Sequence, residues 1–123
     1  MARLKSMFGR WVTRVSVEIA SGCIYISGAA EYDDRPGPIR EELVSMVRTW
    51  QGALLRCVQQ AIETGDLKPD TDAAQLVFEM YGLILALHHD ARFLRMPGSV
   101  ERARAGFDRL IENYRNPQKM QAH

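Results

Sequence analysis

Apolar residues recur at steps of three and four along most of the chain, which is the spacing of amphipathic helices. The first such segment runs from Arg3 to about Ala20, with basic residues between its apolar positions. Those positions are Leu4, Met7, Phe8, Trp11, Val12, Val15 and Ile19. The pattern predicts a helix that ends at Ser21-Gly22, because glycine readily adopts the left-handed conformation that follows a last turn.

The next segment, Cys23 to Tyr32, consists of small and apolar residues. Its alternation could suit a β-strand, but no other part of the sequence offers a partner strand. A lone strand would leave its backbone groups unpaired, so a short buried helix is the better prediction.

A turn at residues 33–38 then introduces a long helix. Proline fits the first helical turn, where a missing N–H costs nothing, and Glu41 and Glu42 favour the positive end of the helix dipole. Apolar residues keep helical spacing from Ile39 to Ile62, and Gly65 follows as the expected end of the helix.

Two further helices complete the pattern. Asp72, with Gln75 three residues later, predicts a capped fourth helix that runs to about Arg95. Ser99 is a good N-cap for a fifth helix, and Asn116 marks its end. The fold class predicted is therefore all-α, a five-helix bundle in one domain over residues 1–115, followed by a flexible tail at 116–123.

The fourth helix has two apolar stripes about a third of a turn apart. A helix this apolar must be buried on more than one side, so its second stripe is predicted to meet another subunit. The first stripe comprises Ala73, Val77, Met80, Tyr81, Ile84 and His88, widened by Leu76, Leu83 and Leu87. The second comprises Phe78, Gly82, Leu85, His89 and Phe93.

Composition narrows the functional classes. The 123 residues suffice for one domain, and a net charge of +1 offers no field that would attract nucleic acid or an anionic membrane. Cys23 and Cys57 have no metal or redox spacing, which indicates reduced thiols and a cytoplasmic protein. No apolar run approaches the roughly 18 residues of a membrane span.

Signals for catalysis or metal binding are weak. His88 and His89 point about 100° apart on a helix, so they cannot converge on one ion; they are interpreted as a core or pocket histidine and an interface histidine. Ser27 lacks a nucleophile motif. Cys23 could be a reactive thiol, although a space-filling role suits it better. We therefore expect no enzyme activity, no metal and no cofactor.

Aromatic residues with polar tips suggest a cavity instead. Trp11, Tyr25, Trp50 and Tyr81 come from four predicted helices, and such side chains need partners when they are buried. Together with His88 they are predicted to surround a largely apolar pocket. Glu31 is either a polar anchor at its rim or a surface charge that pairs with Arg35.

With these residues in order, the chain resembles the C-terminal half of a TetR-family transcriptional repressor from about Leu4 to Tyr114. The features that carry the resemblance are "GC" at Gly22-Cys23, "EYDDRPGPIREEL" at Glu31 to Leu43, Trp50, "AIETGDLKPDTD" at Ala61 to Asp72, and a fat apolar helix before a final amphipathic one.

The resemblance implies an effector sensor that dimerises through its last two helices, which form a four-helix bundle. A small apolar or amphipathic molecule would bind at Trp11, Cys23, Tyr25, Glu31, Trp50, Tyr81 and His88. A second copy of the chain would bind at Phe78, Gly82, Leu85, His89, Phe93, Phe107, Leu110, Ile111 and Tyr114.

Family members begin with a helix-turn-helix domain, and nothing before Leu4 could be one. We expect DNA binding only through such a missing N-terminal domain. Two alternatives stay open: a stand-alone helical dimerisation module with a filled core, and a helical-bundle enzyme.

Overall fold

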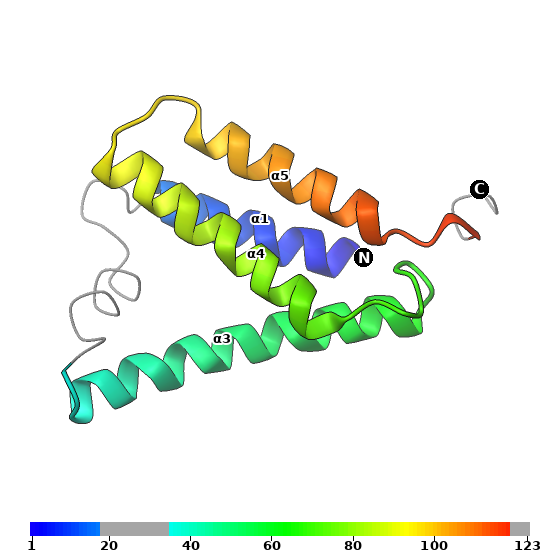
Figure 1. Cartoon of the computed structure of the whole chain (residues 1–123), viewed down its shortest axis with the longest axis horizontal. Coiled ribbons are helices and arrows are strands. Elements are labelled where there is room, and N and C mark those ends of the chain that lie inside the picture. The colour runs from blue at the N-terminus through cyan, green and yellow to red at the C-terminus, as the bar shows by residue number, and fades with distance from the viewer. Residues whose placement is uncertain (18–34, 119–123) are drawn as a thin grey trace.

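The structure, a computed structural model, describes residues 1–17 and 35–118, and this part of the chain is helical (Figure 1). Its elements are α1 (Ala2–Val17), α3 (Pro38–Glu63), α4 (Ala73–His88), the π-helix η1 (His89–Phe93) and α5 (Ser99–Tyr114). The predicted all-α class is confirmed. The predicted short helix between Cys23 and Tyr32 lies outside the described residues, so the five-helix count stays a prediction.

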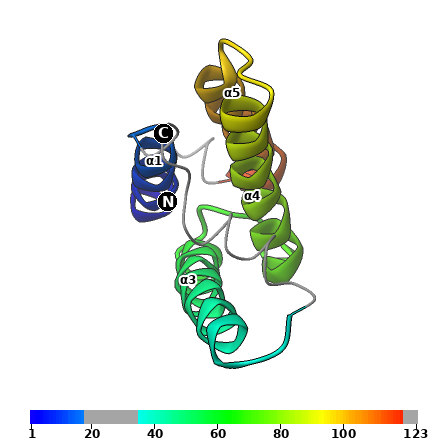
Figure 2. The ribbon, with the colours of Figure 1, turned by 90° about the vertical axis from the view of Figure 1, so that its left-hand side faces the viewer.

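Three of the helices run side by side, and the fourth crosses beneath them. In Figure 1, α1 and α5 lie along α4, whereas α3 meets α4 near its own C-terminal end and diverges from it toward its N-terminus. Seen from the side, α1, α3 and the α4–α5 pair occupy three corners of the bundle (Figure 2).

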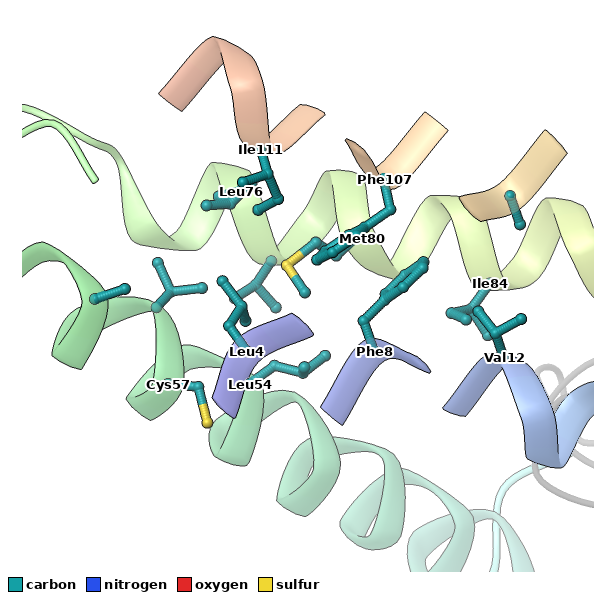
Figure 3. Close-up of a cluster of buried hydrophobic side chains, with 14 of the residues drawn as sticks. Leu4, Phe8, Val12, Leu54, Cys57, Leu76, Met80, Ile84, Phe107 and Ile111 are labelled. Atoms are coloured by element: carbon teal, nitrogen blue, oxygen red, sulfur yellow. The ribbon is translucent and has the colours of Figure 1, made fainter. Parts of the chain in front are cut away.

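The hydrophobic core fills the space where these helices meet (Figure 3). On α1, Leu4, Phe8 and Val12 follow one another at four-residue steps and are fully or almost fully buried. Burial of each such side chain contributes about 1.5–3 kcal/mol. Their buried neighbours on the other helices include Leu54, Val58, Leu76, Met80, Ile84, Phe107 and Ile111.

The N-termini of α4 and α5 are capped differently. The Asp72 side chain accepts a hydrogen bond of 3.1 Å from the Gln75 amide, which confirms the predicted cap. The prediction for α5 was wrong, because Gly98 (φ 80°) occupies the cap position and Ser99 is already helical. Ser99 is buried and its hydroxyl donates to the Met96 carbonyl at 2.8 Å, and no side-chain hydrogen bond caps the start of α5.

The end of α4 departs from the predicted continuous helix to Arg95. After His88 the backbone widens into a π turn, in which the Leu94 amide donates to the His89 carbonyl at 3.1 Å. Arg95 then adopts a positive φ of 55°, which is unfavourable for a residue with a side chain. Short π segments of this kind occur frequently at functional sites.

The α3–α4 turn is tied to the end of α5. The Lys68 amide donates to the Tyr114 carbonyl at 2.8 Å, and the Asn116 amide donates to the Asp66 carbonyl at 3.0 Å. Leu67 lies between them and is fully buried. The chain is therefore held in place as far as Asn116, the first residue of the predicted tail.

Candidate functional site

The N-terminal half of α3 carries an apolar stripe that is only partly covered. Ile39 is 55% exposed and Met46 is 44% exposed, while Leu43 and Trp50 are half-buried. Farther along the helix the same stripe is buried among α1 and α4. The stripe opens toward solvent because α3 diverges from α4 in this direction (Figure 1).

Helix lengths explain why the stripe extends beyond the core. At 1.5 Å per residue, the 26 residues of α3 span about 39 Å, whereas the 16 residues of α1 or α4 span about 24 Å. Roughly the first ten residues of α3 therefore overhang its neighbours. The α3 wall, as we call it, comprises the overhanging residues Ile39, Leu43, Met46 and Val47, together with Trp50, which lies about one turn farther along and packs against the core.

On α4, two polar side chains lie on the side of the helix that is buried within the subunit. Tyr81 is half-buried and packs against the core, and His88, two turns later, is buried. Burial, the Arg92 guanidinium and neighbouring His89 lower the pKa of His88. Its imidazole is therefore neutral at pH 7, and a neutral imidazole can donate one hydrogen bond and accept another.

The outer side of α4 is a second apolar surface. Phe78 is 73% exposed, Leu85 is 37% exposed and Phe93 is 74% exposed, and Gly82 and His89 between them are exposed as well. These five residues, which we call the α4 stripe, lie on the side of the helix away from the core. Large apolar side chains gathered on one face commonly mark an interaction surface.

The chain matches the family model of the tetracyclin repressor-like, C-terminal domain over residues 1–107. It belongs to that family. A comparison with curated proteins gave no match. Domains of this family are regulatory rather than catalytic, and they are typically associated with effector binding and dimerisation.

In this tetracyclin repressor-like domain, three residues of the predicted ligand site can be located. Trp50 lies in the α3 wall, and Tyr81 and His88 lie on α4. The side chain of Trp11 falls outside the described part, as do the residues Cys23, Tyr25 and Glu31. The structure therefore shows only the predicted pocket residues that α3 and α4 contribute.

The region midway between α1, α3 and α4 is occupied by side chains. Phe8, Leu54 and Met80 are buried there and belong to one core cluster (Figure 3). Among the described residues, the centre of the bundle is therefore filled, whereas the α3 wall stays partly uncovered. Sequence reasoning did not single out Ile39, Leu43, Met46 and Val47 as site residues, although the length of the predicted helix could have indicated an overhang.

Two residues predicted for the dimer interface lie in the core of the subunit instead. Phe107 and Ile111 are buried in the subunit's own core, where the Phe107 ring stacks on Phe8 with centroids 4.1 Å apart. The apolar face of α5 is narrow, and α1 and α4 already cover it. Leu110 and Tyr114 are half-buried, and the Tyr114 hydroxyl donates to a Glu79 carboxylate oxygen at 3.0 Å.

Two glycines on the paired helices α4 and α5 have different surroundings. A Cβ added at Gly82 would have no neighbour within 4 Å, whereas one added at Gly106 would lie 2.8 Å from a Leu83 methyl carbon. A side chain at Gly106 would therefore require the Leu83 side chain on α4 to shift. Gly82, which has no side chain, leaves a gap between the larger side chains of the α4 stripe.

Other site types find little support among residues 1–17 and 35–118. No group of three His, Cys, Asp or Glu side chains in that part is arranged to hold a metal ion. None of its helices is both long and apolar enough to cross a membrane. A hollow of about 570 Å³ on α3 is open and lined by Arg40, Glu41, Val44, Ser45, Arg48 and Thr49.

Proposed function

We propose that this chain is the effector-sensing and dimerisation domain of a TetR-like transcriptional repressor in the cytoplasm. It binds a small apolar or amphipathic molecule and thereby controls DNA binding by a helix-turn-helix domain that precedes it. Family membership supports the regulatory role. The observation that carries the sensing role is the α3 wall, an apolar surface that is only partly covered.

The chemistry of the wall favours an apolar effector with a few polar atoms. Ile39, Met46 and Trp50 offer apolar contacts, and Tyr81 and His88 are the polar groups on the neighbouring helix. Ligand sites between the helices of bundles are typically built from this mixture. A neutral imidazole suits an uncharged polar atom on the ligand better than a fully ionic group.

A fluorescent amphipathic probe, 1-anilinonaphthalene-8-sulfonate, tests the wall. The native protein should bind the probe, and Met46→Asp should raise its dissociation constant at least tenfold, because a charge would replace an apolar contact. Ser45→Asp is the matched control, since Ser45 is the exposed neighbour of Met46 on the polar side of α3. Equal binding by both variants would contradict the proposal.

The α4 stripe supports dimerisation with a second copy. A two-fold packing would place each stripe against its copy, and obligate interfaces bury upwards of about 2,000 Å² in total. Leu85→Glu should then cost several kcal/mol of association, because an unpaired charge would be desolvated.

Sedimentation at micromolar concentration tests the dimer. The native chain and Ser45→Glu, which adds the same charge to exposed α3, should sediment as dimers, and Leu85→Glu as a monomer. A monomeric native chain, or a Leu85→Glu variant that remains fully dimeric, would refute this part of the proposal.

One observation favours a second candidate, a dimerisation module that binds no effector. The centre of the bundle is filled by Phe8, Leu54 and Met80, and this filled centre supports a module without an effector site at that position. The two candidate functions make different predictions only for ligand binding at the α3 wall. A native dimer that fails to bind the fluorescent probe would favour the module.

A further inference from the structure

The five residues of the α4 stripe are arranged almost symmetrically about Leu85. Phe78 lies seven residues before it and Phe93 eight residues after it, while Gly82 and His89 lie three before and four after. At about 1.5 Å per residue, each phenylalanine is about 10–12 Å from Leu85 along the helix, in opposite directions. These three apolar side chains are all exposed on the described subunit. The stripe thus has a large ring at each end and a leucine at its centre.

Gly82 and His89 occupy mirrored positions in this arrangement but differ in size. A Cβ added at Gly82 would find no neighbour within 4 Å among the described residues beyond its own turn of helix, so the surface there is open. His89 is exposed, and its ring lies beside that of Phe93 with centroids 5.1 Å apart and planes inclined by 33°. One side of Leu85 therefore carries a gap, and the other side carries an imidazole ring.

The two ends of the stripe also differ in charge. Residues 68–79, around Phe78, carry three acidic side chains and one basic one, whereas residues 88–96, around Phe93, carry two basic side chains and one acidic one. The exposed members of the majority charge are Asp70 and Asp72 at the first end and Arg95 at the second. Like ends of two copies would therefore repel each other, and unlike ends would attract.

We propose that two copies of this chain pack their α4 stripes antiparallel, about a two-fold axis that passes close to Leu85. This inference rests on the dimer proposed above and adds its register. Leu85 then meets its own copy, Gly82 receives the partner's His89, and Phe78 lies against the partner's Phe93. In such an isologous interface each contact between two different residues occurs twice.

A parallel packing of the same stripes is less favourable. It would pair each residue with its own copy, so two glycines would leave an unfilled space and two His89 rings would compete for one position. It would also bring the two acidic ends together and the two basic ends together. The antiparallel register avoids all three penalties, because it places large side chains against the gap and opposite charges near each other.

Cysteine cross-linking with diamide tests the register in the full chain. A disulfide requires Cβ atoms within about 4.5 Å of each other. An equimolar mixture of Phe78→Cys and Phe93→Cys chains should form a mixed disulfide. Phe78→Cys alone should not cross-link, since the two copies of this position lie about 20 Å apart in the antiparallel register. The native chain is the control for Cys23 and Cys57, which every variant retains.

A pair of substitutions tests the contact at Gly82 without cross-linking. Gly82→Leu fills the gap, so it should raise the dimer dissociation constant about tenfold or more in sedimentation. The subunit itself should fold, because leucine favours a helix more than glycine does, and far-UV circular dichroism checks this. Adding His89→Ala should lower the dissociation constant again about tenfold, because the partner's smaller side chain leaves room for the leucine. In a parallel packing the leucine would meet its own copy, and His89→Ala would not restore association.

The outcomes separate the register from the dimer. A native dimer overturns the register alone if Phe78→Cys cross-links with itself, if the mixture forms no mixed disulfide, or if His89→Ala fails to restore association. A mixed disulfide together with that restoration supports the antiparallel register. A native chain that sediments as a monomer at micromolar concentration overturns both the register and the dimer.

Discussion

The ring of Phe8 on α1 lies stacked on the ring of Phe107 on α5, with centroids 4.1 Å apart and planes inclined by only 8°. Both side chains are almost fully buried. The pair joins the first and last helices of the described chain directly, so the final helix is part of the subunit's core. α5 therefore stabilises the monomer whether or not a partner is present.

Truncation of this pair should destabilise the subunit strongly. Phe107→Ala is expected to lower the free energy of unfolding by about 3–5 kcal/mol, because it leaves a cavity in a well-packed core. A double-mutant cycle with Phe8→Ala should give a coupling of about 0.5–1.5 kcal/mol for the stacked rings. Urea unfolding, at protein concentrations low enough for separate subunits, measures both quantities.

Phe78→Ala is the matched control, because it removes an equally large ring that is exposed on α4. Its unfolding free energy should change by less than about 1 kcal/mol. A loss at Phe78 as large as that at Phe107 would contradict the assignment of Phe107 to the core and of Phe78 to the outer surface.

The cap of α4 should be measurable in isolation. The Asp72 carboxylate accepts the Gln75 amide, so Asp72→Ala should cost about 0.5–2 kcal/mol in thermal or urea unfolding. Asp70→Ala, in the same turn and exposed, should stay within about 0.5 kcal/mol of the native protein. Equal effects would mean that loss of a local charge, and not loss of the cap, explains the change.

The hydrogen bond between Tyr114 and Glu79 predicts a dependence on alkaline pH. Burial, the bond to Glu79 and the charges of Glu79 and Asp72 raise the pKa of Tyr114 above its ordinary value of 10.0. The folded state therefore holds this proton more tightly than the unfolded state. The resulting stability is complete below pH 10 and is lost as the pH rises through the folded pKa.

Tyr114→Phe should therefore cost about 0.5–1.5 kcal/mol at pH 7 and make the unfolding free energy less dependent on pH above 10. Urea unfolding between pH 8 and 11 provides the comparison. Glu79→Gln keeps an acceptor for the hydroxyl and removes the charge, so it should weaken the pH dependence with a smaller loss at pH 7. An unchanged alkaline profile in Tyr114→Phe would refute the assignment.

The left-handed backbone at Arg95 predicts a stabilising substitution. A residue with a side chain in this conformation is strained by about 1–3 kcal/mol, and glycine adopts it without that strain. Arg95→Gly should raise the unfolding free energy by about 1 kcal/mol. The same change at Arg104, exposed within α5, should lower it by about 1 kcal/mol. Thermal unfolding that moves in the same direction for both variants would contradict this backbone assignment.

Features that depend on a few neighbouring residues could be predicted from the sequence. The Asp72 cap, the start of α3 at Pro38 and its long apolar periodicity all arise from contacts within a turn or two of the chain. The two apolar sides of α4 could also be predicted, because the period of an α-helix places each side chain on a definite side.

Ser99 shows where local reasoning ends. A serine before an apolar run usually caps a helix, but this hydroxyl is buried and bonds to the Met96 carbonyl. Its environment depends on how the α4–α5 loop packs against the bundle, which no short sequence pattern encodes.

The sequence by itself determined which residues form helices and which sides of those helices are apolar, because both follow from a 3.6-residue repeat. Only the tertiary structure decided what covers each apolar side. The same spacing describes Phe107, which meets Phe8 inside the subunit, and Phe78, which faces outward. Burial is a property of neighbours distant in sequence, and the overhang of α3 emerges only when helices of unequal length pack together.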